Sequence, residues 1–456
     1  MSTNHANMFD NLPLEMVHEV ASHLESDTEL VRFRQVNSAI RDAIDCDGFS
    51  FWRRLFGTKF EPSRFVGATE HNGASYMGDY QARRTWLKNG AKFQDGRSME
   101  ERRCLEILLD LILDANSGRR SFIKKAKGGE YASRNLLALV EFAKKENITF
   151  NPNLGTRSAR PNPLLEIVQV MLAPFMLDLS STSIVPVTGY LASQNIVYSI
   201  PESRPIVLGG IDVDLEWVLH QINFWRHHLT SEAESSLFYE YDELEPHKKP
   251  RFWTEQLHAK HKPDIGRLWK GSFANVDCAD LPFVRAGRND GNGSILDGFC
   301  NSADDRMIFD LEVKLDTHKE ADWDGIHEDH LHSFDFPESQ NDTSSGSRSV
   351  EVVDRARGSA AGELVGKGWL HTLPSQEGVP GWQRVTLVQH IKDEFGNIDH
   401  GWICVYEGLV LPGGQIILGR WSVPDDIDKE SGPFIMWNQD AAWENTLPED
   451  VQESAC

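Results

Sequence analysis

The sequence lacks paired cysteines and long apolar runs. Its six cysteines are widely spaced and form no Cys-x-x-Cys pair: Cys46, Cys104, Cys278, Cys300, Cys404 and Cys456. This spacing argues against a zinc ribbon or a disulfide scaffold, and it indicates a reducing compartment. No stretch approaches the roughly 18 consecutive apolar residues of a membrane-spanning helix. The sequence therefore predicts no transmembrane segment.

Basic charge is scarce relative to acidic charge. The chain of 456 residues has 46 Lys and Arg against 69 Asp and Glu, which gives a formal net charge of −23. Because a surface this acidic repels phosphate groups, we expect neither nucleic acid nor a membrane as a partner. The opening residues MSTNHANMFDN contain no apolar core of a signal peptide, so a cytoplasmic or nuclear location, or both, is expected.

Motifs that would give the chain its own chemistry are missing. No Gly-x-x-x-x-Gly-Lys-Ser/Thr phosphate loop and no Gly-x-Ser-x-Gly nucleophile elbow occurs. Residues 290–301 depart from a calcium-binding loop, since Ile295 stands at the sixth position and Asn301 at the twelfth. The best metal candidate, residues 327–332 with three histidines, lacks the His-Glu-x-x-His order and is better explained as a solvated loop. The sequence predicts no catalytic residue, no metal and no cofactor.

Three short helices are predicted between residues 9 and 60. Asn11 and Pro13 suit a helix start, and Ser26 to Thr28 can end that helix and cap the next. Apolar residues at helical spacing follow in all three segments: Met16, Val17, Val20, Leu24; Leu30, Val31, Phe33; Val36, Ala39, Ile40, Ala43, Ile44. Helices this short bury little surface by themselves, so part of the apolar surface is expected to meet a partner chain.

This stretch resembles the F-box. The resemblance rests on Leu12-Pro13, on Glu15, on the aliphatic residues Met16, Val20 and Leu24 of the first helix, on the sequence of residues 30–36, and on Trp52. Residues 37–40 depart from the family pattern. It implies docking on the Skp1 adaptor of a cullin-RING ubiquitin ligase. The contact residues would then be Leu12, Pro13, Glu15, Met16, Val17, Val20, Leu24, Leu30, Val31, Phe33 and Val36. The alternative is an ordinary helical bundle that packs on the rest of the chain.

The middle of the chain has helical periodicity. Helices are expected near residues 80–87, 98–112, 133–146, 164–179 and 212–225, with Pro174 breaking the fourth. Residues 182–208 are β-branched and interrupted by prolines, so short strands or loops are expected there. We interpret residues 61–260 as a helical support region.

Alternating apolar residues dominate after Trp269. Strands are predicted at residues 268–274, 307–315, 364–373, 382–391, 401–410, 415–423 and 434–437. Residues 411–414 predict a hairpin turn, and residues 316–360 a polar, disordered insertion. The predicted fold class is therefore α+β: a three-helix F-box (9–60), a helical middle region (61–260) and a C-terminal antiparallel β-barrel or sandwich (261–440).

The β region resembles the C-terminal β-barrel that follows the F-box in one group of F-box proteins. The matching pieces are residues 269–273, Gly408, residues 419–421 and residues 432–437. This resemblance implies recognition of a target protein in or at the mouth of the barrel.

Three residues of the β region are candidates for binding a target. Trp402 and Trp421 lie on adjacent predicted strands, and Trp is a favoured residue at interfaces. Arg420 could bind a carboxylate through two parallel hydrogen bonds. The alternatives are a core position for each Trp and a solvated position for the Arg.

The leading hypothesis is a non-catalytic substrate-recognition subunit of a Skp1–cullin–F-box ligase, which binds Skp1, through it a cullin, and an unidentified target protein. Two rivals remain. One is a β-barrel that binds a small apolar ligand, and the other is an enzyme whose site has no recognisable motif.

Overall fold

Two compact units make up the chain. The computed structural model describes residues 12–24, 26–46, 50–61, 73–117, 133–146, 148–152, 161–201, 203–257, 265–287, 295–299, 307–316, 348–354, 363–392, 398–424, 427 and 430–440. The first unit comprises Met1–Lys92, Met99–Glu146 and Thr254–Gln256, and the second Phe93–Ser98, Asn147–Trp253 and Leu257–Cys456. The domain limits predicted at residues 60, 260 and 440 stay predictions.

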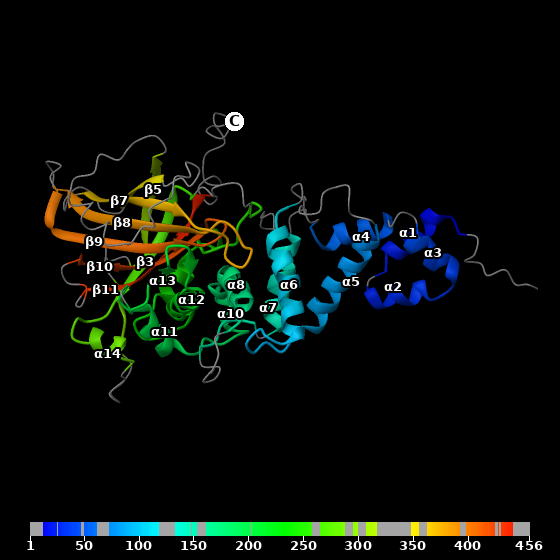
Figure 1. The fold of residues 1–456 in the computed structure, drawn as a ribbon, viewed down its shortest axis with the longest axis horizontal. Helices are drawn as coiled ribbons and strands as arrows, with labels where there is room; N and C mark the ends of the chain where they lie inside the picture. Colours follow the sequence, from blue (N-terminus) through cyan, green and yellow to red (C-terminus); the bar gives the residue numbers. More distant parts are fainter. Residues whose placement is uncertain are drawn as a thin grey trace, which may run out of the picture. The chain divides into compact units, whose positions relative to one another are not determined.

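Helices form the described part of the first unit (Figure 1). They are α1 (Leu14–Ser22), α2 (Asp27–Arg34), α3 (Ser38–Cys46), α4 (Ser50–Lys59), α5 (Gly73–Asn89), α6 (Met99–Asp114) and α7 (Arg134–Lys145). The helix expected at residues 80–87 starts earlier, at Gly73. The third N-terminal helix forms despite the departure at residues 37–40, because the Asn37 side chain accepts the Ile40 N–H at 2.7 Å.

The second unit begins with a helical layer. Its helices before the barrel are α8 (Pro163–Met171), α9 (Ala173–Met176), α10 (Leu179–Thr182), α11 (Tyr190–Val197), α12 (Leu215–Thr230) and α13 (Phe238–Glu243), with a small hairpin of β1 (Val207–Leu208) and β2 (Asp212–Val213). Asp214 caps α12 as its position suggests, accepting the Trp217 N–H at 3.0 Å. The helix predicted to break at Pro174 is interrupted at Leu172, between α8 and α9, and Pro174 lies in the first turn of α9.

The expectation of only strands or loops between residues 182 and 208 was wrong for α11. Gly189, at φ 68°, starts this helix from a left-handed conformation that glycine adopts without strain. Ser193, Gln194 and Val197 then lie on its buried side. Two of these three side chains are polar, so hydropathy alone did not indicate a helical face.

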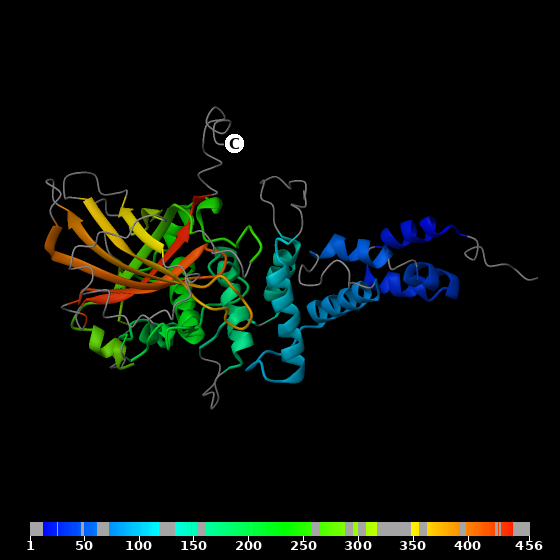
Figure 2. The same ribbon diagram turned by 45° about the horizontal axis from the view of Figure 1, so that its top comes forward.

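A closed antiparallel barrel forms the rest of the second unit. Its strands are β3 (Leu268–Asn275), β5 (Phe309–Asp316), β6 (Arg348–Asp354), β7 (Glu363–Thr372), β8 (Gln383–Lys392), β9 (Ile398–Val410), β10 (Ile416–Ser422) and β11 (Ser431–Asn438). Each pairs with the next, and β11 pairs back with β3, as in Phe434 opposite Phe273. In Figure 2 the yellow to red strands curve as one wall. The short helix α14 (Leu281–Arg285) and β4 (Gly298–Phe299) follow β3. The predicted fold class is confirmed, with a barrel rather than a sandwich. The first part differs in one detail, since the described residues between 9 and 60 form four helices, α1 to α4, where three were predicted.

Strand β6 corrects one part of the sequence interpretation. Residues 348–354 were expected to belong to a disordered insertion, but they pair with both β5 and β7. Val350 and Val352 face the barrel core and are 3 % and 4 % exposed. The alternation covers only two inward residues within a stretch rich in Ser and Asp, so its signal was weak. Residues 317–347 and 355–360 of that insertion lie outside the described residues.

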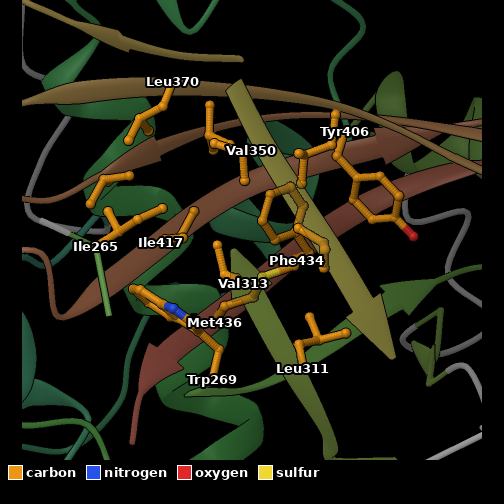
Figure 3. Packing of buried hydrophobic residues seen from close by; sticks show 14 of the residues in the cluster. Ile265, Trp269, Leu311, Val313, Val350, Leu370, Tyr406, Ile417, Phe434 and Met436 are labelled. Carbon is orange, nitrogen blue, oxygen red and sulfur yellow. The ribbon is translucent and has the colours of Figure 1, made fainter. Parts of the chain in front are cut away.

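Side chains fill the described part of the barrel interior (Figure 3). Trp269, Phe434 and Met436 meet there with aliphatic side chains from the opposite wall. Gly419 is required by this packing, since a Cβ at that position would lie 2.3 Å from the Phe434 ring. The core therefore consists of the inward residues of the strands, and the outward residues remain for helices or partners.

Candidate functional site

Helix α1 presents one apolar side to its own unit and another to solvent. Pro13 precedes the first turn, where its missing N–H costs nothing, and Glu15 lies in that turn, where its charge favours the helix N-terminus. Val17 is 2 % exposed, whereas Met16 and Val20, one turn apart, are 50 % and 40 % exposed. A single apolar face predicted from spacing is thus divided between interior and surface.

Helix α2 repeats this division. Ser26 and Glu29 form a reciprocal capping box, in which the Ser26 hydroxyl accepts the Glu29 N–H and the Glu29 carboxylate accepts the Ser26 N–H, both at 3.2 Å. Leu30 is buried, whereas Val31 is 46 % exposed, and Val36, just beyond the helix, is 47 % exposed. The capped start fixes which side of this short helix faces outward.

Partly buried contacts between the helices support these exposed side chains. The His18 imidazole on α1 hydrogen-bonds the Ala43 carbonyl on α3 at 2.9 Å. Asp45 accepts the indole N–H of Trp52 at 3.0 Å and forms an ion pair with Arg34, whose guanidinium lies over the Trp52 ring. Trp52, the predicted marker of this stretch, therefore connects α2, α3 and α4.

The structure sorts the predicted adaptor contacts into three groups. Pro13, Glu15, Met16, Val20, Val31 and Val36 are exposed; Leu12, Leu24 and Phe33 are half-buried; Val17 and Leu30 are buried. Large aliphatic side chains at 40–50 % exposure are suited to burial against a partner. The two buried residues can support such a surface but do not face outward.

The comparison with protein families identifies this region. Residues 9–58 match the F-box-like family. No curated protein and no solved structure matches the chain. The chain therefore carries an F-box-like domain at residues 9–58 and joins it to a C-terminal β-barrel, as the sequence predicted.

The candidate target residues of the barrel occupy different environments. Trp402 lies in β9, but its side chain is outside the described residues. Trp421 points into the barrel core at 8 % exposure, and its indole donates to the Ala274 carbonyl at 3.1 Å. Arg420, on the other side of the wall, is 6 % exposed. Core packing thus accounts for Trp421.

Arg420 does bind a carboxylate, but the carboxylate belongs to this chain. Glu407 of β9 accepts hydrogen bonds from Arg420 of β10 at 3.2 Å and from Arg384 of β8 at 2.7 Å. All three side chains are less than 10 % exposed. Because isolated charges are costly to bury, both arginines depend on the shared Glu407 carboxylate.

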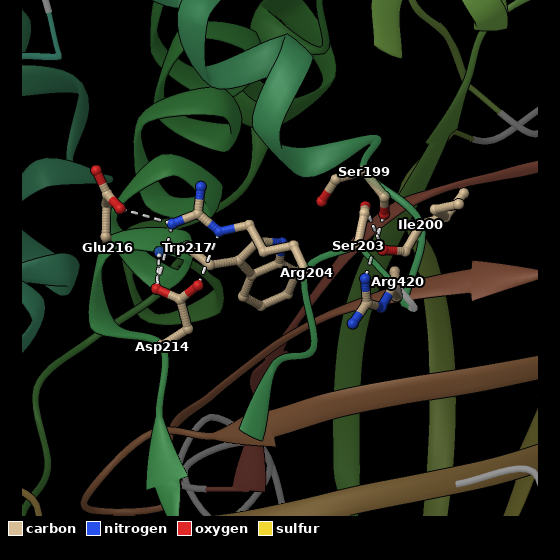
Figure 4. Close-up of polar contacts among 8 residues, drawn as sticks. All are labelled: Ser199, Ile200, Ser203, Arg204, Asp214, Glu216, Trp217 and Arg420. Carbon is tan, nitrogen blue, oxygen red and sulfur yellow. Dashed lines mark hydrogen bonds and ion pairs between the residues drawn. The ribbon is translucent and has the colours of Figure 1, made fainter. Parts of the chain in front are cut away.

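The helical layer covers this charged group. The Arg420 guanidinium donates to the Ser199 carbonyl after α11 (Figure 4) and lies 5.8 Å from the centroid of the Trp217 ring of α12. Figure 4 also shows Arg204 with its two carboxylate partners, Asp214 and Glu216. Gln221 of α12 donates to the Gly419 carbonyl of β10 at 3.3 Å. The outer face of β10 is therefore an internal surface of the second unit.

A small hollow opens beside this charged group. It is lined by Glu407, Arg420 and Trp421, by Arg285 of α14, and by the segment 197–201 after α11. Arg285 donates to the Tyr198 and Ile427 carbonyls and to the Ser431 hydroxyl. Two of the three residues predicted to bind a target, Arg420 and Trp421, therefore line this hollow, and both also bond to other parts of the chain.

A second buried polar cluster was not predicted from the sequence. Asp297, 2 % exposed, accepts the Tyr198 hydroxyl at 2.7 Å and the Gln194 amide at 3.0 Å, and it also contacts Tyr190 and His228. Burial raises the pKa of the Asp297 carboxyl well above its usual range and lowers the pKa of His228 well below its own. Both shifts favour neutral forms, so the contact between Asp297 and His228 at 3.1 Å is a hydrogen bond rather than an ion pair. This cluster attaches residues 295–299 to α11 and α12.

Within the described ranges, no three His, Cys, Asp or Glu side chains come together in a way that could hold a metal ion. The candidate segment at residues 327–332 lies outside those ranges. None of the helices in the described part of the chain has both the length and the hydropathy needed to cross a bilayer.

Proposed function

We propose that this chain is the target-recognition subunit of a Skp1–cullin–F-box ubiquitin ligase. The F-box-like helices would bind Skp1, and Skp1 would connect the chain to a cullin. The second unit would hold a target protein within reach of the ligase. In this role the chain has no catalytic residue of its own, and it acts by bringing target and ligase together.

One observation carries the proposal: the matched F-box-like helices expose Met16, Val20, Val31 and Val36. Exposed aliphatic side chains on a capped and internally supported pair of helices form a surface that gains free energy on burial, at roughly 25 cal/mol per Å² of apolar area. Rigid helices lose little conformational entropy on binding, which favours affinity. These are the properties that docking on an adaptor requires.

The test is a binding measurement with purified Skp1 and the full-length chain. Met16→Asp and Val31→Asp each place a charge at the centre of the proposed interface. We expect each to weaken Skp1 binding by about 30-fold or more, the loss typical of central interface residues. The matched control is Leu137→Asp, at an aliphatic position of α7 in the same unit that is 47 % exposed.

The expected result is lost capture for the two α1 and α2 variants and unchanged capture for Leu137→Asp. If wild-type protein does not bind Skp1, or if all three variants bind equally well, the adaptor role is wrong. A complementary experiment compares the proteins that accumulate in cells when Leu12 and Pro13 are both changed to Ala. Their identity would give the target class.

A further inference from the structure

The F-box-like helices make strong contacts with a helix beyond the family match. Asp27, the first residue of α2, accepts the Tyr80 hydroxyl at 2.7 Å and the Arg84 Nε–H at 2.7 Å. Both donors lie on α5 (Gly73–Asn89), beyond the matched residues 9–58. They are four residues apart and therefore project from the same side of that helix. One carboxylate thus joins two turns of α5 to the first turn of α2.

Tyr80 also belongs to the aromatic core of the first unit. Its side chain is 3 % exposed, and its ring centroid lies 5.8 Å from that of Trp52 and 6.1 Å from that of Phe60. Burial, together with the Asp27 carboxylate, raises the pKa of the Tyr80 hydroxyl above its usual value, so the hydroxyl remains a donor. The tyrosine thus connects α2, α4 and α5 at one point.

Helix α5 is in turn held by its other neighbours, α4 and α6. Arg83, next to Arg84 on α5, forms an ion pair with Asp114 of α6 at 2.8 Å. Both side chains are almost fully buried, and the Arg83 guanidinium lies over the Phe56 and Phe60 rings. Because α5 is held by α4 and α6, it provides a firm support for α2.

The connection determines how α2 presents its exposed side chains. Helix α2 has only eight residues, and isolated helices of this length are not stable in water. Its direction therefore depends on its capped start and on its contacts with neighbouring helices. Val31 lies one turn after Asp27 and is one of the exposed residues of the proposed Skp1 surface.

We propose that Tyr80 and Arg84 are positioning residues of the Skp1-binding surface, holding α2 through Asp27 so that Val31 and Val36 are presented in a fixed orientation. This inference rests on the proposed adaptor role and extends it beyond the family match. Without the two bonds, α2 must be ordered when Skp1 binds, and that ordering weakens affinity. Tyr80 and Arg84 act through α2 and need no contact with Skp1.

The test uses the full-length chain with Tyr80→Phe, Arg84→Ala and the double variant. Tyr80→Phe keeps the ring packing and removes one hydrogen bond; Arg84 is 41 % exposed, so its removal leaves the core intact. We expect a roughly five- to twenty-fold weaker Kd for Skp1 in the double variant, by calorimetry, from the lost hydrogen bonds and the added ordering. Lys88→Ala, an exposed position one turn further along α5, is the control and should leave the Kd unchanged.

A second readout separates positioning from direct contact. Amide hydrogen exchange of α2 in the free chain should be faster in the double variant than in wild type, and Arg84→Lys should restore part of the protection. Equal Kd values and equal exchange in all variants would overturn the inference while leaving the adaptor role standing. A weaker Kd with unchanged exchange would also overturn it, because it would indicate direct contact. Failure of wild-type protein to bind Skp1 would instead contradict the adaptor role.

Discussion

The F-box-like helices and the barrel strands differ in how far their large apolar side chains are exposed. Met16, Val20, Val31 and Val36 are 40–50 % exposed, whereas the described side chains of the barrel strands include no exposed large apolar residue. The helices thus have apolar surface that only a partner can bury, while the described barrel strands have already buried theirs. A partner of α1 and α2 would therefore meet apolar side chains, whereas a partner of the described barrel strands would meet polar side chains and backbone.

The barrel also buries charge, which gives the largest expected effect of a single substitution. Glu407→Gln leaves the buried Arg384 and Arg420 guanidiniums without their shared carboxylate. We expect a loss of about 3–5 kcal/mol in the unfolding free energy, because removing one partner of a buried ion pair is strongly destabilising. Tryptophan fluorescence in urea measures this loss, since eleven of the 13 tryptophans belong to the second unit and only Trp52 and Trp86 to the first.

The control for this prediction is Glu430→Gln, which removes an equal charge at an exposed position just before β11. It should change the unfolding free energy by less than about 0.5 kcal/mol. A Glu407→Gln protein as stable as this control would contradict the charged group's role in the barrel wall.

The two units should also respond differently to acid. Burial lowers the pKa of His220 to about 3 and those of His227 and His371 to about 4, all in the second unit. A histidine with a lowered folded pKa contributes stability above its unfolded value of about 6.5 and loses it as the pH falls. The raised pKa of Asp297 acts in the opposite direction, so this group adds stability as the pH falls, and the raised pKa of Glu61 does the same in the first unit.

With His228, four histidines of the second unit have a lowered pKa, and together they outweigh Asp297, the one carboxyl with a raised pKa among its described residues. Between pH 7.5 and pH 5 we expect its unfolding free energy to fall by roughly 2–4 kcal/mol. Urea unfolding followed by tryptophan fluorescence at both pH values measures this change, and His371→Asn should reduce it. Equal stability at the two pH values would show that these histidines are not held neutral in the folded chain.

The smallest expected effect is confined to the first unit. Ser26→Ala removes the hydroxyl that accepts the Glu29 N–H and should cost about 1 kcal/mol, the usual value of a helix N-cap. Hydrogen exchange should become faster in α2 and stay unchanged in the barrel. Ser26→Asp, which retains a capping oxygen, should restore slow exchange; faster exchange in β10 as well would contradict the separation of the two units.

The sequence predicted the parts of the fold that have strong local signals. Seven barrel strands, the starts of α2 and α12, and the turn at residues 411–414 were expected from spacing and capping residues. Strand β6 and helix α11 were missed, because their burial comes from tertiary pairing that short or polar segments do not show. Closure of the barrel through β11 and β3 joins segments far apart in sequence, and no local pattern indicates it.

The sequence predicted the F-box-like site at the level of the helix, not of the side chain. Periodicity placed Met16 and Val17 on one face, but the structure exposes the first and buries the second. Likewise, Arg420 had the chemistry to bind a carboxylate, and its partner is Glu407 on the neighbouring strand. Glu407, Asp297 and the α5 residues that hold Asp27 were missed because their partners lie on other elements. Such pairs become visible only once the chain has folded.

The central claim is that Skp1 binds the exposed aliphatic side chains of α1 and α2. Hydrogen exchange of the full-length chain with and without saturating Skp1 tests it most directly. The account predicts strong added protection in residues 12–36 and no added protection in β7 to β11. Protection that appears in the barrel strands and not in residues 12–36 would contradict it.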